Sequence, residues 1–361
     1  MNLERFFQEE PFAWGADEKN GILSDALWKL TEKHRKACEM YRRILEALPN
    51  GTFNSKRIDQ VPTLPIGLFK RYDLKSVSPK AVVRVLTSSG TTSQTVSRIF
   101  LDKETSVLQT KALTCIMRSF IGPKRLPMIL VDSQNVLERK DSMNARGAGL
   151  VGLSLFGRDH FYMLDESMRV RWEELGAFLK EHAGEKILIF GFTSMIWQYF
   201  LEEARAGKRD ISVRNGLLVH GGGWKKLQSL GISNDEFKKA IRNQFQIEQI
   251  HNFYGMAEQV GSIFMECERG YLHVPNCSDI IIRDGRSLEA LRNRKKGIIQ
   301  VLSVLPQSYP GHSLLTEDEG MIEGEDDCRC GRKGKYFQVL GRLPQVELRG
   351  CSDVYAYGES H

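Results

Sequence analysis

Six hydroxyl side chains surround one glycine in the segment Thr87-Ser88-Ser89-Gly90-Thr91-Thr92-Ser93. Hydroxyl and backbone N–H donors grouped in this way can bind an oxyanion, and Gly90 lets the backbone approach it closely. The segment follows the apolar run 81–86, which is typical of a strand, whereas a simple Ser/Thr-rich turn is the alternative. No Gly-Lys-Ser/Thr ending follows, so this is not a Walker loop. The sequence therefore predicts a phosphate-binding loop of another kind.

One histidine and three cysteines form a second candidate site. The set consists of Cys267, His273, Cys328 and Cys330. Three thiols and one imidazole suit tetrahedral Zn²⁺. The C-x-C spacing is tighter than in a usual zinc knuckle, and the two halves lie far apart in the sequence, so reduced buried thiols are the alternative.

Apolar periodicity indicates the elements that must position these groups. Residues 24–48 have helical spacing and predict a helical N-terminal segment. Strand-like runs lie at 81–86, 127–131, 187–190, 216–219 and 297–304. Helical segments lie at 101–120, 166–182, 197–206 and 234–245. This alternation predicts an α/β fold around a largely parallel core sheet at 1–322. The Gly-, Cys- and charge-rich segment 323–361 predicts a small β-rich C-terminal subdomain or tail.

Composition narrows the class of protein. The 361 residues include 51 basic and 45 acidic ones, and the resulting charge of +6 is dispersed, which argues against a nucleic-acid partner but suits anionic substrates or an acidic partner protein. The longest apolar runs are shorter than the roughly 20 residues of a membrane span. The first residues do not resemble a signal peptide. We therefore expect a soluble cytoplasmic protein whose seven cysteines serve as free thiols, metal ligands or a catalytic thiol.

The hydroxyl-rich loop resembles the phosphate-loop signature of the adenylate-forming superfamily, which ends in Gly-x-Pro-Lys. Residues 93–98 lack that glycine, proline and lysine, so a cationic phosphate contact would fall to Arg98. The resemblance implies that the nucleotide phosphates contact Ser88, Ser89, Gly90, Thr91, Thr92 and Arg98.

Further signatures of the same superfamily follow in the expected order. Tyr254-Gly255-Met256-Ala257-Glu258 resembles the Tyr-Gly-x-x-Glu motif, which implies that Tyr254 stacks on adenine and Glu258 holds Mg²⁺. A flat ring suits a purine, and a carboxylate oxygen suits Mg²⁺. The glycine-rich turn of the superfamily implies that an adenine pocket is lined by Gly221, Gly222 and Gly223.

Two signatures lie nearer the end of the chain. Thr316-Glu317-Asp318 resembles a Thr-Gly-Asp motif whose aspartate accepts both ribose hydroxyls, with Glu317 in place of the glycine. Gly341-Arg342 resembles the hinge that follows it, which implies an arginine near ribose or phosphate.

The segments 64–70, 144–150, 156–160 and 347–353 are similar to the acyl-protein synthetases of the LuxE type. This family implies activation of a fatty acid as its adenylate with ATP and Mg²⁺, transfer to a cysteine near the C-terminus, and delivery to a partner acyl reductase. Cys351 matches that cysteine, and a thiolate is a strong nucleophile toward a mixed anhydride. The implied fold is the N-terminal domain of adenylate-forming enzymes without a full C-terminal lysine domain.

Other hypotheses stay open at this point. The adenylate could instead pass to coenzyme A, an amine or a carrier protein. Alternatively, the divergent phosphate loop could belong to a non-catalytic acyl-binding partner of a reductase, and Cys351 could be a buried structural cysteine.

Overall fold

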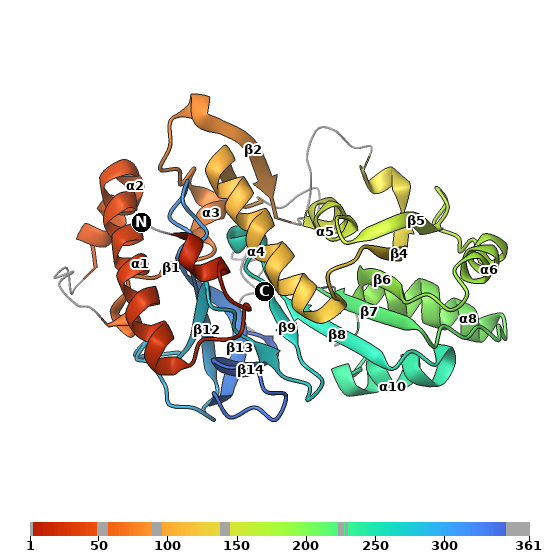
Figure 1. Cartoon of the computed structure of the whole chain (residues 1–361). Coiled ribbons are helices and arrows are strands. Elements are labelled where there is room, and N and C mark those ends of the chain that lie inside the picture. Colours follow the sequence, from red (N-terminus) through yellow and green to blue (C-terminus); the bar gives the residue numbers. More distant parts are fainter. Residues whose placement is uncertain are drawn as a thin grey trace, which may run out of the picture.

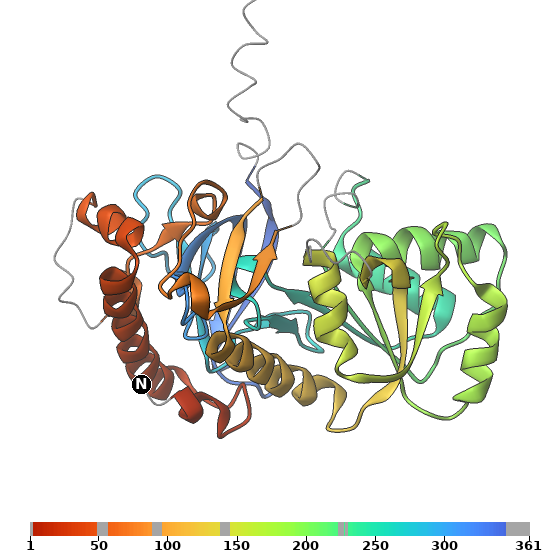
Figure 2. The ribbon, with the colours of Figure 1, turned by 90° about the horizontal axis from the view of Figure 1, so that it is seen from above.

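The computed structural model describes residues 3–48, 57–88, 96–137, 145–222, 227 and 230–343. Twelve strands form one sheet, in which β11-β12-β13-β14-β10-β9-β8-β7-β6-β4-β5 follow one another and β1 pairs with β13. Figures 1 and 2 show an elongated molecule, with α1 and α2 at one end and α6, α8 and α10 at the other.

One end of the sheet is parallel and buried on both faces. Its strands are β4 (Leu126–Ser133), β5 (Gly157–Leu164), β6 (Ile187–Phe192), β7 (Gly216–Gly221) and β8 (Gln249–Tyr254). One face packs against α4 (Lys103–Ile121) and α5 (Ala145–Ser154). The other packs against α6 (Trp172–Glu181), the consecutive helices α7 (Thr193–Met195), η5 (Ile196–Glu202) and α8 (Glu203–Ala206), and α10 (Asn234–Phe245). Helices on both faces explain why the central strands β4, β6 and β7 are largely apolar.

The other end of the sheet is antiparallel. Its strands are β9 (Phe264–Glu266), β10 (Leu272–His273), β11 (Ser278–Arg283), β12 (Gly297–Ser303), β13 (Ser313–Glu325) and β14 (Lys335–Arg342). The short β1 (Leu64–Pro65) runs parallel to β13. The helices α1 (Ala16–Ala37) and α2 (Glu39–Glu46) contribute buried leucines and Tyr41 to the core at this end. The prediction of an α/β fold is confirmed, but the sheet is mixed, and the expected parallel arrangement holds only from β5 to β8.

A separate hairpin carries the hydroxyl-rich loop. β2 (Val82–Thr87) and β3 (Arg98–Asp102) pair with each other outside the large sheet. Backbone N–H of Ser88 donates to the carbonyl of Ser97 at 3.2 Å, which closes the hairpin below the loop. Leu86, Ile99 and Leu101 anchor it in the core of the antiparallel end. The strand expected before the loop is therefore present, but it is not a strand of the central sheet.

Short helices complete the described chain. They are α3 (Leu68–Arg71) and the 3₁₀ turns η1 (Leu3–Phe7), η2 (Ile58–Gln60), η3 (Pro79–Ala81), η4 (Gln134–Leu137) and η6 (Ala257–Gln259). Local caps fix two of the long helices. Asp102 accepts the Thr105 N–H at 2.8 Å at the start of α4, and Ser233 and Glu236 form a capping box on α10.

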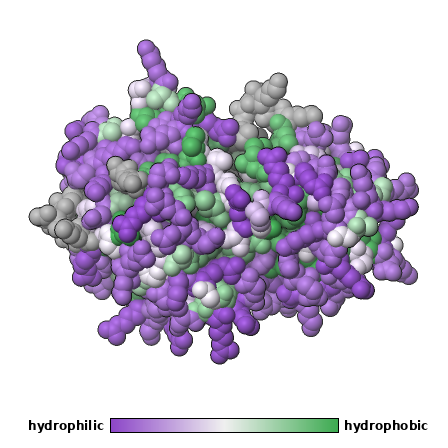
Figure 3. All heavy atoms as spheres, in the orientation of Figure 1, coloured by the Kyte–Doolittle hydropathy of each residue, from purple (hydrophilic) through white to green (hydrophobic). Residues whose placement is uncertain are grey.

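β13 crosses residue 322, where we expected a domain boundary, and β14 pairs with it in the same sheet. A separate C-terminal subdomain stays a prediction. Within the described ranges, no helix combines the length and the apolar character needed to span a membrane. Hydrophilic side chains dominate the face in Figure 3, and hydrophobic ones gather mainly in its middle.

Candidate active site

Two neighbouring parallel strands bring the glycine turn and the aromatic motif to the same edge of the sheet. Gly221 ends β7 and pairs in register with Phe253, and Tyr254 ends β8. A Cβ at Gly221 would lie 2.7 Å from the ring of Phe253, and one at Gly222 would lie 3.1 Å from the ring of Phe192. Gly222 also has φ of +60°, which favours glycine. The close approach requires bare backbone here, and Gly223 lies outside the described residues.

Tyr254 joins the parallel end of the sheet to the expected ribose motif on β13. Its hydroxyl donates to Oδ2 of Asp318 at 2.7 Å. Thr316 supports that aspartate, because its hydroxyl accepts the Asp318 N–H at 3.2 Å. Burial and the adjacent Asp318 carboxylate raise the pKa of Tyr254 well above its usual range, so the phenol remains a hydrogen-bond donor. Two motifs that are 64 positions apart therefore form one contact.

Glu258 lies in the turn η6 that follows Tyr254, and only 7% of the residue is exposed. Its backbone carbonyl accepts the hydroxyl of Tyr309 at 2.8 Å, which fixes the turn. Among the described residues, no side chain donates a hydrogen bond to the Glu258 carboxylate or forms an ion pair with it. A nearly buried carboxylate without such a partner fits a divalent cation, because a cation would offset the cost of its burial. Gly255, between the two, packs near Ile263.

The β2–β3 hairpin, which carries the hydroxyl-rich loop, is held close to Glu258 through residues 308 and 309. Ser308 donates to the carbonyl of Phe100 on β3 at 2.8 Å, and the next residue, Tyr309, contacts Glu258. Ser88 lies at the base of the loop, where its Oγ accepts the Ser97 N–H at 3.0 Å. The other expected phosphate contacts within the loop, Ser89, Gly90, Thr91 and Thr92, lie outside the described residues.

Both expected phosphate cations have carboxylate partners. Arg98 forms an ion pair with Asp73 at 2.7 Å, and Arg342 forms one with Glu317 at 2.8 Å. Arg342 lies opposite Asp318 in the β13–β14 register, so it is close to the expected ribose position, as the motif order implied. Sequence reasoning missed both partners. The only available signal for Glu317 was its replacement of the motif glycine beside Asp318.

The cysteine–histidine set is assembled completely. Cys267 follows β9, His273 ends β10, and the two other cysteines lie between β13 and β14. Since β10 pairs with both β9 and β14, the distant halves of the set meet. All four candidate ligand atoms lie within 4.8 Å of one another.

The distances in this cluster agree with a tetrahedral ion. Sγ of Cys267 and Sγ of Cys328 are 4.0 Å apart, and Sγ of Cys330 and Nε2 of His273 are 3.3 Å apart. Ordinary zinc bond lengths give about 3.8 Å between sulfurs and about 3.6 Å between sulfur and nitrogen. Burial raises the pKa of Cys267 to about 12 and lowers that of His273 to about 4, which favours neutral groups. A dication would instead stabilise thiolates beside a neutral imidazole, so the residues fit zinc.

Arg332 links this cluster to α4. Its guanidinium lies 4.2 Å from the ring centroid of Phe120 and pairs with Glu268 at 2.8 Å. No sequence motif pointed to this arginine, because its partners come from elements far apart in the chain. Cys351, the expected acyl acceptor, lies outside the described residues.

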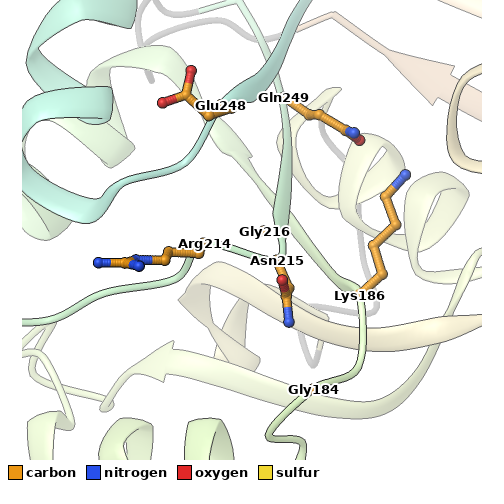
Figure 4. A pocket seen from close by; sticks show the side chains of 7 residues that line it. All are labelled: Gly184, Lys186, Arg214, Asn215, Gly216, Glu248 and Gln249. Atoms are coloured by element: carbon orange, nitrogen blue, oxygen red, sulfur yellow. The ribbon is translucent and has the colours of Figure 1, made fainter.

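A hollow at the opposite edge of the sheet is distinct from this site. Figure 4 shows Lys186, Arg214, Asn215, Glu248 and Gln249 around it, together with two glycines. These residues lie at the amino ends of β6, β7 and β8, whereas the nucleotide motifs lie at the carboxyl ends. Ligands of open parallel sheets bind at carboxyl ends, so the hollow does not compete for the nucleotide.

The fold of the described residues is similar to that of adenylate-forming enzymes of known structure. A structure of 2-hydroxyisobutyryl-CoA ligase in an open conformation with 2-HIB-AMP and CoA is similar at a TM-score of 0.69 and 16% identity, over 93% of this chain and 77% of that one. The postadenylation state of the same ligase has a TM-score of 0.70 at 16% identity, over 92% and 70% of the two chains.

The family profile "Acyl-protein synthetase, LuxE" matches residues 3–357, so the chain belongs to this family of ligases. Two curated relatives are named "Long-chain-fatty-acid--luciferin-component ligase". The one from Vibrio harveyi is 21% identical over 96% of this chain and 90% of its own length. The one from Aliivibrio fischeri is 22% identical over 96% and 91%.

Proposed function

We propose that this protein uses ATP and Mg²⁺ to activate a fatty or other hydrophobic carboxylic acid as an acyl-adenylate. The contact between Tyr254 and Asp318 carries this proposal, since it unites the adenine and ribose motifs at the edge where β7 and β8 end. The names of the curated relatives support a long-chain acid as substrate.

Different residues bind the adenine, the ribose and the metal ion in this proposal. In this proposal the purine lies at the strand end beside Gly221 and Gly222, which pack closely against Phe253 and Phe192, and the ring of Tyr254 is its aromatic neighbour. Asp318, oriented by Thr316 and Tyr254, accepts the ribose hydroxyls. Glu258 holds Mg²⁺, which when bound would neutralise phosphate charge.

The first half-reaction joins the acid to AMP. A carboxylate oxygen of the acid attacks the α-phosphorus, the bond to the β-phosphate oxygen breaks, and pyrophosphate leaves with the electron pair. This step requires charge stabilisation and positioning but no protein nucleophile.

The second half-reaction passes the acyl group to Cys351. Its thiolate attacks the acyl carbon of the mixed anhydride, AMP leaves as its phosphate anion, and a thioester remains on the chain. A thioester keeps the acyl group reactive enough for delivery to a partner acyl reductase.

Cys267, His273, Cys328 and Cys330 bind a structural zinc in this proposal. The ion would connect β9, β10 and the turn before β14, and the set contains no open position for chemistry. Its role is therefore to stabilise the junction between the two ends of the sheet.

An acid-dependent ATP–pyrophosphate exchange assay across chain lengths and aromatic acids tests the first half-reaction. If none of the acids in the series supports exchange, only a non-catalytic acyl-binding role would remain.

Intact-mass analysis after incubation with acid and ATP tests the second half-reaction. Cys351→Ala should retain exchange and lose the hydroxylamine-labile acyl adduct, while Cys38→Ala serves as a control that retains both. An adduct that persists on Cys351→Ala would assign the acceptor to another residue, and exchange without any adduct would favour coenzyme A, an amine or a carrier protein.

A further inference from the structure

The two arginines that the motifs indicate as phosphate contacts each form an ion pair with a carboxylate of the protein. Arg98 is paired with Asp73, and Arg342 is paired with Glu317. The loop residues 89–97 contain no lysine or arginine. Enzymes that transfer nucleotide phosphates generally place cationic side chains beside the metal ion, because the triphosphate carries several negative charges. Additional positive charge beside the phosphates would therefore come from another segment.

Residues 67–73 lie between the two ends of the expected nucleotide position. At one end, a Cβ on Gly67 would lie 4.0 Å from Oε1 of Glu317, next to the ribose motif. At the other end, Asp73 reaches Arg98 at the base of the phosphate loop. The single turn α3 lies within this segment and contacts β3, as its position beside the hairpin in Figure 1 also shows.

α3 is fixed by its buried residue. Phe69 is 1% exposed, and its ring packs edge-on against Tyr309 at 6.1 Å between centroids. Tyr309 in turn binds the carbonyl of Glu258. The turn is thereby tied to the residue that we assign to Mg²⁺.

Two adjacent cations occupy the exposed part of this turn. Lys70 and Arg71 follow Gly67 by three and four positions. In a helical turn, residues at these spacings lie on the same side of the turn as the first residue, which is Gly67 here. Both are exposed, and neither forms an ion pair with any residue of the described ranges. Their long side chains can reach several ångströms from the backbone.

We infer that Lys70 and Arg71 bind the phosphates of ATP and replace the lysine that the phosphate loop of this chain lacks. This inference rests on the proposed adenylation. It assigns the 64–70 segment a role in the site, because β1 fixes that segment alongside β13 just before the ribose motif.

The double variant K70M/R71M tests the inference, since methionine keeps much of the side-chain volume and removes the charge. The matched control is K124M/R125M, an exposed Lys-Arg pair between α4 and β4 that lies toward the amino end of the parallel strands and also lowers the net charge by two. Calorimetry on the full chain would compare MgATP with adenosine, and K70R/R71K should restore most of the affinity.

K70M/R71M should weaken MgATP binding by about tenfold to a hundredfold, as expected for lost charge-assisted contacts, and leave adenosine binding within about twofold. Equal losses for ATP and adenosine would show a merely structural role and overturn the inference. Unchanged ATP binding, or an equal loss in K124M/R125M, would overturn it as well. Wild-type protein without acid-dependent exchange would instead refute the adenylation on which it rests.

Discussion

The cysteine–histidine cluster and the sheet edge that carries the nucleotide motifs are both built from segments far apart in the sequence. They differ in how many of their expected contacts form within the protein itself. The cluster has all four of its candidate ligand atoms within 4.8 Å of one another, since short antiparallel strands pair directly beside it. At the sheet edge that carries the nucleotide motifs, Tyr254 contacts Asp318, and the nearly buried Glu258 carboxylate has no side-chain partner among the described residues. Strand pairing brings all four candidate zinc ligands together, whereas the residues of the nucleotide motifs would be bridged by a bound ligand. Mutations should therefore reduce stability at the cluster and binding or turnover at the edge.

Cys328→Ala should have the largest effect. Loss of one ligand should reduce zinc from one ion per chain to almost none, and lower the free energy of unfolding by more than about 4 kcal/mol. Elemental analysis and denaturant unfolding measure the two quantities. Cys38→Ala removes a buried thiol outside the cluster and should keep its zinc. Stoichiometric zinc in Cys328→Ala would contradict the zinc site.

Glu258→Gln should come next, with turnover in pyrophosphate exchange lowered by about a hundredfold, because one charged metal ligand is lost at the phosphates. The replacement is nearly isosteric, so the unfolding free energy should change by less than about 1 kcal/mol. Exposed Glu289 provides the control variant Glu289→Gln, which should exchange normally. Full exchange in Glu258→Gln would remove this residue from the metal role.

Asp318→Ala should weaken adenosine binding by about tenfold or more, since both ribose hydroxyls lose a charged acceptor. Calorimetry with adenosine, without phosphates or acid, isolates this effect. Unaltered adenosine affinity would mean that the contact between Tyr254 and Asp318 is structural and does not mark the ribose position.

Tyr254→Phe should have the smallest effect, because the ring remains and only the donor to Asp318 disappears. We expect the KM for ATP to rise by less than about tenfold with little change in kcat. If Tyr254→Phe loses more adenosine affinity than Asp318→Ala, the Tyr254 hydroxyl itself contacts the ligand.

Much of the parallel end could be predicted from the sequence. The apolar runs at 127–131, 187–190 and 216–219 are confirmed as β4, β6 and β7, because strands buried on both faces read as unbroken apolar segments. β9 and β10 were not predicted. They have three and two residues, too few for any periodicity, although they bring the zinc candidates together.

The same contrast holds for individual site residues. Tyr254 and Asp318 could be selected from motif order, and the structure places them in contact. The pairing of Arg98 with Asp73 could not, because it depends on how the 67–73 segment lies against the hairpin. Local patterns identify the motif residues, but the charge that remains available to a ligand depends on tertiary partners.

The end of β14 has a consequence for the rate of the acyl transfer that we propose. Arg342 lies opposite Asp318, and Leu343 N–H donates to the carbonyl of Glu317 at 2.9 Å, so the chain leaves the sheet beside the expected ribose position. Cys351 is eight residues further on, and a chain of that length spans at most about 29 Å in any conformation. In the proposed reaction, a thiol tethered this closely would have an effective concentration on the order of millimolar at the adenylate. The chain's own cysteine would then outcompete free thiols of similar reactivity that are present only at micromolar concentration.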